Sequence, residues 1–403
     1  MNFENYDFDI VSNFDIRISN LKMGMTKKIL IVAGEPSGDL HAGRLVNNLK
    51  NLDPDLRFFG MGGSLLKNAG ADISFDISKL ALVGLVEVWK NIFTVGKVYK
   101  GLLKRIDAEK PDMAILVDYP GFNLRLAKEL KKRSIPVIYY ISPQVWVWGR
   151  NRVNIIRACV KKILVFFKFE EELYRACGID AGFVGHPSVD TVRADRPKDE
   201  TLKAYGLSSL KRTIALLPGS RAIEVKRLLP IMVDAAGIIN SKTSDTQFII
   251  AKYPDLPASL YEDALKNSGL GIKIGSGDTY NILAASDFAI VASGTATLET
   301  AIIGTPLIIV YTANLLTYIV YKFVATIKFV GIVNIIAGRE IAPEFLQYEA
   351  TPVKIAEKAV SILSDAKTME KMREELRGVK NSLGEPGASM RAAKIISQVI
   401  LSR

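Results

Sequence analysis

The chain has 403 residues, 49% of them apolar and 8% aromatic, which excludes a disordered chain and is enough for two domain cores. Its net charge of +11 is not gathered in a long Lys/Arg run, so the surface is expected to suit anionic partners: nucleotide phosphates, anionic lipid or nucleic acid. No nucleic-acid-binding motif appears, which makes nucleic acid the least favoured of these partners.

Cysteine and histidine usage predicts no metal centre. The two cysteines, Cys159 and Cys177, lack metal-ligand spacing and are expected to be reduced thiols. The two histidines, His41 and His186, cannot form a metal cluster by themselves.

Residues 1–25 differ from the rest of the chain. They are polar and slightly acidic, without the basic start and apolar run of a signal peptide. Met23 and Met25 directly precede a good first strand. We therefore predict that residues 1–25 are a disordered tail, or a segment that is not translated.

From residue 26 onward, apolar strand segments alternate with helical segments. This alternation predicts the α/β class, with two doubly wound parallel sheets in tandem. The hinge is expected after Gly185-His186-Pro187, where residues 193–200 are charged and contain proline. The predicted strands are Lys28–Ala33, Arg57–Gly60, Met113–Val117, Val137–Tyr140 and Lys162–Phe166, then Thr213–Leu217, Phe248–Ala251, Ile272–Ile274, Phe288–Val291 and Leu307–Val310.

The first strand is followed by the turn Gly34-Glu35-Pro36-Ser37-Gly38-Asp39. It is neither a dinucleotide GxGxxG nor a P-loop, but a small-residue turn that opens a helix and could hold an anion. Ser37 and Asp39 are equally expected as ordinary helix caps. Capping does not explain Glu35, which is predicted to point from the strand tip into a cleft.

Residues 83–106 are predicted to form one long helix. Apolar side chains recur every three or four residues, with lysines interleaved. Core packing with a solvated face is the favoured interpretation. The alternative is an interfacial face, with Trp89 and Phe93 in a bilayer surface and lysines on anionic headgroups.

The strand Met113–Val117 delivers Asp118, followed by a proline–glycine turn and Asn123. A carboxylate at this edge of a parallel sheet is a candidate general base, although such an aspartate is often only a helix cap. The next strand leads to an aromatic loop that contains Gln144, Trp146 and Trp148. Buried packing and an apolar substrate wall are both open for this loop.

Two turns of the second half are candidate phosphate sites. Gly219-Ser220-Arg221 ends a strand and opens a helix, so the guanidinium is predicted to clamp a phosphate. Ser293-Gly294-Thr295 does the same after Val291, and its helix is predicted to run to Ile303. Glu299, one turn further, is placed to accept hydrogen bonds from a ribose.

Residues 301–338 are strongly apolar, yet Gly304, Pro306, Asn314 and Gly331 interrupt them. We predict a buried strand followed by an apolar helix over Leu315–Lys328, rather than a membrane span.

The chain resembles the lipid-A-disaccharide synthase family. The resemblance runs from about residue 28 to the C-terminus and rests on a specific set of motifs. These are GEPSGD (34–39), LVGLVEV (82–88), VDYPGFN (117–123), YISPQVWVW (140–148), GHP (185–187), LLPGSR (216–221), ASGTATLE (292–299), NIIAGRE (334–340) and APEFLQ (342–347). One departure is Val333, where many members of the family carry proline.

The resemblance implies a GT-B glycosyltransferase, with two Rossmann-like domains facing a central cleft. Such an enzyme transfers a 2,3-diacylglucosamine unit from UDP to the 6-hydroxyl of 2,3-diacylglucosamine 1-phosphate, with inversion. The products are a β-1,6 disaccharide phosphate and UDP, and no metal or cofactor is needed. It works in the cytoplasm, peripherally on the anionic inner membrane of a Gram-negative-type bacterium. A homodimer, the acyl-chain length and the degree of domain closure stay open.

The resemblance also implies a division of labour among domains and residues. Residues 26–190 would bind the acceptor, residues 191–384 would bind the UDP-sugar, and a helix in 385–403 would return to the N-terminal domain. Asp118 matches the family's proposed base, with Glu35 and Arg221 as further candidate catalytic residues. The candidate substrate-binding residues are Ser37, Gly38, Glu87, Asn123, Gln144, Trp146, His186, Gly219, Ser220, Ser293, Gly294, Thr295, Glu299, Asn334, Glu344 and Gln347.

Three other functions stay open from the sequence. A GT-B-type enzyme on a soluble sugar nucleotide, such as a UDP-GlcNAc 2-epimerase, is disfavoured by the aromatic loop and the apolar region. A nicotinamide oxidoreductase is disfavoured by the missing GxGxxG. A non-catalytic nucleotide-binding module would have no use for Asp118 together with Arg221.

Overall fold

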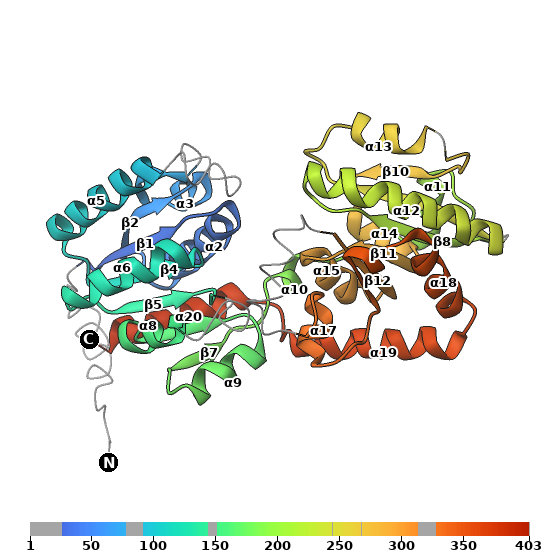
Figure 1. Ribbon diagram of the computed structural model, residues 1–403. Coiled ribbons are helices and arrows are strands. Elements are labelled where there is room, and N and C mark those ends of the chain that lie inside the picture. The colour runs from blue at the N-terminus through green and yellow to red at the C-terminus, as the bar shows by residue number, and fades with distance from the viewer. Residues whose placement is uncertain are drawn as a thin grey trace, which may run out of the picture.

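The computed structural model describes residues 26–77, 92–143, 151–243, 245–266, 268–312 and 328–402. It forms two lobes, each built on a parallel sheet with helices on both faces (Figure 1). The predicted α/β class with two doubly wound units is confirmed. The expectations for residues 1–25 and for most of the apolar helix Leu315–Lys328 lie outside the described residues.

The N-terminal sheet has seven strands in the order β3-β2-β1-β4-β5-β6-β7. Every pairing in it is parallel. The strands are β1 (Lys28–Ala33), β2 (Arg57–Gly62), β3 (Asp72–Asp76), β4 (Met113–Val117), β5 (Val137–Tyr140), β6 (Lys162–Val165) and β7 (Ala181–Phe183). The central strands β1, β4 and β5 are almost wholly buried, as expected for continuous apolar runs covered on both faces.

The helices of this lobe are α2 (Pro36–Leu52), α3 (Ser64–Asn68), α5 (Ile92–Glu109), α6 (Pro120–Lys132), α8 (Asn151–Cys159) and α9 (Lys168–Ala176). The C-terminal helix α20 (Ala388–Leu401) returns to the same lobe (Figure 1). It packs against α2. Lys27 Nζ donates to the carbonyl of Ile400 at its end.

The C-terminal sheet has six strands in the order β10-β9-β8-β11-β12-β13. The strands are β8 (Arg212–Leu217), β9 (Thr246–Lys252), β10 (Lys273–Ser276), β11 (Phe288–Ala292), β12 (Leu307–Tyr311) and β13 (Glu344–Leu346). The helices are α11 (Lys198–Ala204), α12 (Ala222–Lys242), α13 (Ser259–Leu265), α14 (Thr279–Ala285), α15 (Thr295–Ile303), α17 (Ile332–Ala337), η2 (Gln347–Glu349), α18 (Pro352–Leu363) and α19 (Ala366–Ser382).

Two crossings of the chain join the lobes, and they are tied to each other. The first contains Gly185, His186 and α10 (Ser188–Thr191), and the second leads from α19 to α20. His186 N donates to the Leu383 carbonyl at 2.9 Å, and Gly387 N donates to Asp190 Oδ1 at 2.6 Å. The segment that precedes the predicted hinge is therefore one half of a double connection between the lobes.

The long helix predicted over 83–106 corresponds to α5, whose described part begins at Ile92. Leu102 and Ile106 are buried in the core, while Lys97, Lys100 and Lys104 are exposed. Core packing of one face is confirmed for this part, and its lysine-bearing face is exposed. Residues 83–91, which include Trp89, lie outside the described residues.

No helix in the described part of the chain combines the length and the apolarity that a bilayer crossing requires.

Candidate active site

The first group of candidate residues lies where the order of the N-terminal sheet reverses. β1 and β4 are neighbours in this sheet although they are distant in sequence, and Ala33 is paired with Val117 at their carboxyl ends. Glu35 follows the first strand and Asp118 follows the second. In open α/β sheets this switch point is where ligands bind. The fold therefore brings both candidate catalytic carboxylates to one edge.

The carboxyl group of Asp118 is mostly buried, and this burial is the main cause that raises its pKa to about 6. The neighbouring Glu35 carboxylate raises it further, while a hydrogen bond from the Tyr119 backbone N–H opposes the shift. A base with a pKa near the working pH accepts a proton from an alcohol more readily than an ordinary aspartate does. Because its pKa is raised, Asp118 is a stronger base than an aspartate of ordinary pKa.

The turn 34–39 contains both exposed and buried residues. Glu35 and Ser37 are exposed at the start of α2, whereas Gly38 and Asp39 are buried. Asp39 does not cap its own helix, as one expectation had it. Its carboxylate accepts hydrogen bonds from the N–H groups of Gly63, Leu65 and Leu66, so it caps α3 instead.

Asn123 is fully buried in the first turn of α6. Its Nδ2 donates to the carbonyl of Val117 at 3.1 Å and to that of Asp118 at 2.8 Å. The predicted contact between Asn123 and substrate is not available in this conformation, because the side chain faces the strand tip rather than solvent.

The second group of candidates lies at the corresponding switch point of the C-terminal sheet. Leu217 of β8 is paired with Val291 of β11. The turns that follow these strands, 218–221 and 293–295, are therefore adjacent. Each opens a helix, α12 or α15, so two helix N-termini lie at one edge of the sheet.

The turn before α15 presents open backbone. Gly294 has φ 144 and ψ −160, a conformation that favours glycine, and a Cβ added there would meet nothing within 4 Å. Gly294 and Thr295 are exposed. Ser293 is turned inward, since its Oγ donates to the Val330 carbonyl at 3.2 Å.

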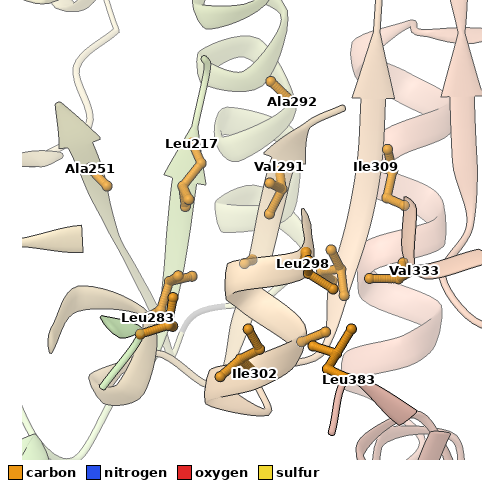
Figure 2. Close-up of a cluster of buried hydrophobic side chains, with 14 of the residues drawn as sticks. Leu217, Ala251, Leu283, Val291, Ala292, Leu298, Ile302, Ile309, Val333 and Leu383 are labelled. Atoms are coloured by element: carbon orange, nitrogen blue, oxygen red, sulfur yellow. The ribbon is translucent and has the colours of Figure 1, made fainter. Parts of the chain in front are cut away.

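A buried apolar cluster fixes the direction of α15. Figure 2 shows Leu298 and Ile302 of this helix directed into the cluster, together with Leu283, Val333 and Leu383. The helix start is therefore held by a packed core, and its first N–H groups, which have no helical acceptors, keep a constant direction.

The turn before α12 contains the exposed Ser220 and Arg221. Glu224, one turn into the helix, accepts from Ser220 N and Arg221 N and pairs with the Arg221 guanidinium, with Nη1 and Oε1 3.0 Å apart. A Cβ on Gly219, which has φ 116, would lie 2.6 Å from Glu224 Oε2. Glu224 is not among the residues predicted from the sequence, although a glutamate at the third helical position is a known capping signal.

Glu299 lies on α15 behind the exposed turn, and Tyr280 Oη of α14 donates to its Oε1 at 3.2 Å. Burial raises the pKa of the Glu299 carboxyl, whereas the tyrosine hydrogen bond lowers it. Burial also raises the pKa of Tyr280 to about 12, so the phenol stays a donor at neutral pH. No local pattern in the sequence marks Tyr280 as a partner of Glu299.

Asn334 and Glu344 form an internal network beside the same turn. Asn334 is fully buried, and its side chain bonds Ile341 N, the backbone of Ala342 and Glu344 Oε1. Glu344 also accepts from Val330 N and Gly331 N. Both side chains hold the loop that contacts Ser293, so the predicted substrate contact of Asn334 is not available in this conformation.

Gln347, another candidate, follows β13 and has a backbone φ of 53.

His186 lies in the first crossing between the lobes. Its Nδ1 accepts from Ser188 N at 3.1 Å, and its ring stacks on Phe167 with centroids 5.1 Å apart. Burial lowers its pKa to about 4, with His41 as a second cause. The structure therefore gives His186 packing contacts within this crossing. The candidates Glu87, Gln144 and Trp146 lie outside the described residues.

Comparison with known proteins decides the family. A family model described as lipid-A-disaccharide synthetase matches residues 29–399. The chain belongs to the lipid-A-disaccharide synthase family. A lipid-A-disaccharide synthase of Syntrophus aciditrophicus is 44% identical over 369 residues, which cover 91% of this chain and 96% of that protein. The resemblance seen in the motifs is confirmed, and the chain is an enzyme of the glycosyltransferase class.

Solved structures support the GT-B fold of this synthase-family chain. A UDP-GlcNAc 2-epimerase from Neisseria meningitidis, bound to UDP-GlcNAc, superposes with TM-score 0.57 at 13% identity, covering 93% of this chain and 100% of that one. A glycosyltransferase from Rickettsia africae superposes with TM-score 0.55 at 13% identity, covering 94% of this chain and 99% of that one. At these identities the likeness shows the fold alone, and the family rests on the closer relatives.

Proposed function

We propose that the chain condenses UDP-2,3-diacylglucosamine with 2,3-diacylglucosamine 1-phosphate, giving the β-1,6 lipid A disaccharide phosphate and UDP. The observation that carries the proposal is the contrast between the two switch points. One presents the carboxylates Glu35 and Asp118, and the other presents Arg221 beside the exposed starts of α12 and α15. An inverting transfer needs a base on one side of the sugar and anion stabilisation on the other.

In this proposal Asp118 accepts the proton of the acceptor 6-hydroxyl as that oxygen attacks C1 of the donor sugar. The bond between C1 and the diphosphate oxygen breaks, and UDP departs with the electron pair. Entry opposite to the leaving group inverts the configuration at C1. The proton stays on Asp118, where the raised pKa of about 6 makes its transfer from the alcohol less unfavourable.

The C-terminal lobe receives the leaving diphosphate. Arg221 is the only proposed cationic ligand, and its side chain pairs with Glu224 but is 78% exposed, so it can reach a phosphate. The exposed start of α15 at Gly294 and Thr295 adds N–H donors and a partial positive charge. Glu299, held by Tyr280, is placed for a ribose hydroxyl.

The N-terminal lobe binds the acceptor, at the turn that carries the exposed Glu35 and Ser37. The acceptor carries acyl chains, and each CH₂ buried in a bilayer holds it there by about 0.8 kcal/mol. The enzyme therefore works at the membrane surface. The exposed Lys97, Lys100 and Lys104 of α5 supply the attraction to anionic headgroups.

The membrane step has its own test. Replacing Lys97, Lys100 and Lys104 together by glutamate should reduce cosedimentation with phosphatidylglycerol-containing vesicles. Lys367, Lys371 and Lys380 of α19 are also exposed, and glutamate at those positions makes the same charge change on the other lobe. Equal binding by the two triple variants would reject α5 as the membrane-facing element.

The reaction is tested by incubating the protein with both lipid substrates and analysing the products by mass spectrometry. Disaccharide phosphate and UDP should appear together, and only when donor and acceptor are both present. Conversion of UDP-GlcNAc without an acceptor, and no disaccharide, would instead support an epimerase.

A further inference from the structure

The backbone that carries Asp118 is strained. Asp118 has φ 46 and Tyr119 has φ 48, so two consecutive non-glycine residues occupy the left-handed region. Each such residue costs about 1–3 kcal/mol and persists only where its surroundings hold it. The regular ladder ends just before, at the pair Val117 and Tyr140. The strand tip therefore needs other contacts to keep its shape.

Two buried side chains supply those contacts. Tyr139 Oη donates to the carbonyl oxygen of Asp118 at 2.6 Å, and Asn123 Nδ2 donates to the same oxygen at 2.8 Å. Tyr139 comes from the neighbouring strand β5, and Asn123 comes from the helix that follows the tip. The carbonyl is thus held from two directions by elements that are themselves buried.

Neither side chain is available to a substrate. Tyr139 and Asn123 are both 0% exposed. Burial raises the pKa of the Tyr139 hydroxyl well above its usual value, so it stays a neutral donor. Asn123 Oδ1 has no hydrogen-bond partner among the described residues. Leaving a buried acceptor without a hydrogen bond costs about 1–3 kcal/mol. The side-chain amide of Asn123 is therefore oriented so that Nδ2 donates to the strand tip, although this leaves Oδ1 without a partner among the described residues.

The ring of Tyr119 completes the arrangement. It stacks on Phe122 with ring centroids 5.7 Å apart. The same ring lies so close to the backbone of Gly34 that an added Cβ there would be 2.0 Å from Tyr119 Cδ1. Gly34 precedes Glu35, so the same contact fixes the separation of the two carboxylate-bearing turns.

We propose that Tyr139 and Asn123 are positioning residues, which hold the strained strand tip so that the Asp118 carboxylate stays in its desolvated place beside Glu35. This inference rests on the proposed function, in which that carboxylate accepts the acceptor proton. Displacing a reacting group by about 1 Å can cost about 100-fold in rate.

The test compares Tyr139→Phe with Tyr140→Phe. Both residues are fully buried on the same strand, but among the described residues the Tyr140 hydroxyl contacts Ser389 of α20 and makes no hydrogen bond to the strand tip. Tyr139→Phe is expected to lower kcat by about 10–100-fold, with the Kd for UDP unchanged. Tyr140→Phe should leave kcat unchanged. Asn123→Asp, which replaces the donor by an acceptor, should lower kcat at least as much as Tyr139→Phe.

A second readout does not depend on turnover. The carboxyl ¹³C resonance of Asp118 is followed by NMR during a pH titration of each variant. Its midpoint, expected near the raised pKa of about 6 in the wild type, should fall toward 3.8 in Tyr139→Phe as the carboxyl becomes solvated. Glu35 and Tyr119 face the same carboxyl and are unchanged in these variants.

The two readouts separate this inference from the proposed function. An unchanged kcat or an unchanged titration midpoint in Tyr139→Phe overturns the positioning role. A wild-type protein that makes no disaccharide overturns the proposed function, and the NMR midpoint then decides the positioning role alone. A parallel loss of UDP binding and thermal stability, without a shifted midpoint, would show a merely structural role.

Discussion

The guanidinium of Arg221 lies 3.0 Å from the carboxylate of Glu224, across the first turn of α12. The same carboxylate accepts from the N–H groups of Ser220 and Arg221. In this position Glu224 makes the contacts that a phosphate would make at a helix N-terminus. It therefore keeps the donors of this turn oriented when no nucleotide is bound.

We predict that Arg221→Met weakens UDP binding by about 10–100-fold, since a charge-assisted hydrogen bond contributes about 1.5–3 kcal/mol. Isothermal titration calorimetry measures the change. Arg227→Met is the matched control, because Arg227 is also exposed on α12 but lies further from the turn. Equal affinities of the two variants would exclude Arg221 as a phosphate ligand.

Asp118 is predicted to reduce the stability of the folded protein at neutral pH. Its carboxyl has a folded pKa of about 6 against an ordinary 3.8, so above about pH 6 the folded state holds a desolvated charge. Asp118→Asn should therefore raise the free energy of unfolding at pH 8, by up to about 3 kcal/mol. The gain should shrink as the pH falls through about 6 and vanish below about 4, where both states of the wild type are protonated. Urea unfolding at several pH values measures it, and a destabilised variant at pH 8 would contradict the prediction.

The two half-buried histidines, His41 and His186, are predicted to make the protein sensitive to acid. Burial lowers the pKa of His41 and of His186 to about 4, from an ordinary 6.5. Their neutral forms therefore stabilise the fold above about pH 6.5, and this contribution is lost as the pH falls toward 4. Each group contributes a slope of up to about 1.4 kcal/mol per pH unit in that window.

Replacement of His41 by glutamine should make the loss of stability between pH 6.5 and 4 smaller than in the wild type. The comparison is made between variants because Asp118 contributes with the opposite sign over part of the same window. Identical slopes for wild type and His41→Gln would show that His41 titrates normally.

The crossing between the lobes is predicted to tolerate no side chain at Gly185. This residue has φ 85, and an added Cβ would lie 2.5 Å from Arg391 Nη2 and 3.1 Å from the Leu383 carbonyl oxygen. Gly206 is the matched control, because it has φ 65 and nothing lies within 4 Å of its added Cβ. Gly206→Ala therefore measures the cost of a side chain at positive φ without a steric clash. This cost is about 1–2 kcal/mol in the free energy of unfolding. Gly185→Ala should lower the free energy of unfolding by more than that, as measured by thermal unfolding. If both variants lose the same stability, the backbone around Gly185 moves to accommodate the added Cβ and the prediction is wrong.

Much of the fold was predictable, because long buried strands carry continuous apolar runs. β1, β4 and β5 were predicted with the bounds that the structure has. The strands that were missed are β3, β7 and β13, each of which lies at an edge of its sheet. Their residues are only half buried, so neither length nor periodicity distinguishes them from loops.

The site was predictable only where function follows from strand ends. Asp118 and Ser293-Gly294-Thr295 follow apolar strands, and the strand order then brings each to a switch point. The side chains that support them gave no local signal. Tyr139 meets Asp118 across the sheet, and Tyr280 meets Glu299 from another helix, so only the folded chain shows these pairs. The motifs make Asn123 and Asn334 candidate substrate ligands, and no motif shows that both side chains are fully buried.

The most direct measurement uses one preparation of Asp118→Asn, assayed for UDP binding by calorimetry and for disaccharide formation with both lipid substrates. We predict that the UDP affinity matches the wild type, because the nucleotide contacts are assigned to the other lobe, while disaccharide formation falls by at least about 100-fold. Wild-type turnover by this variant would contradict the assignment of Asp118 as the base and, with it, the proposed mechanism.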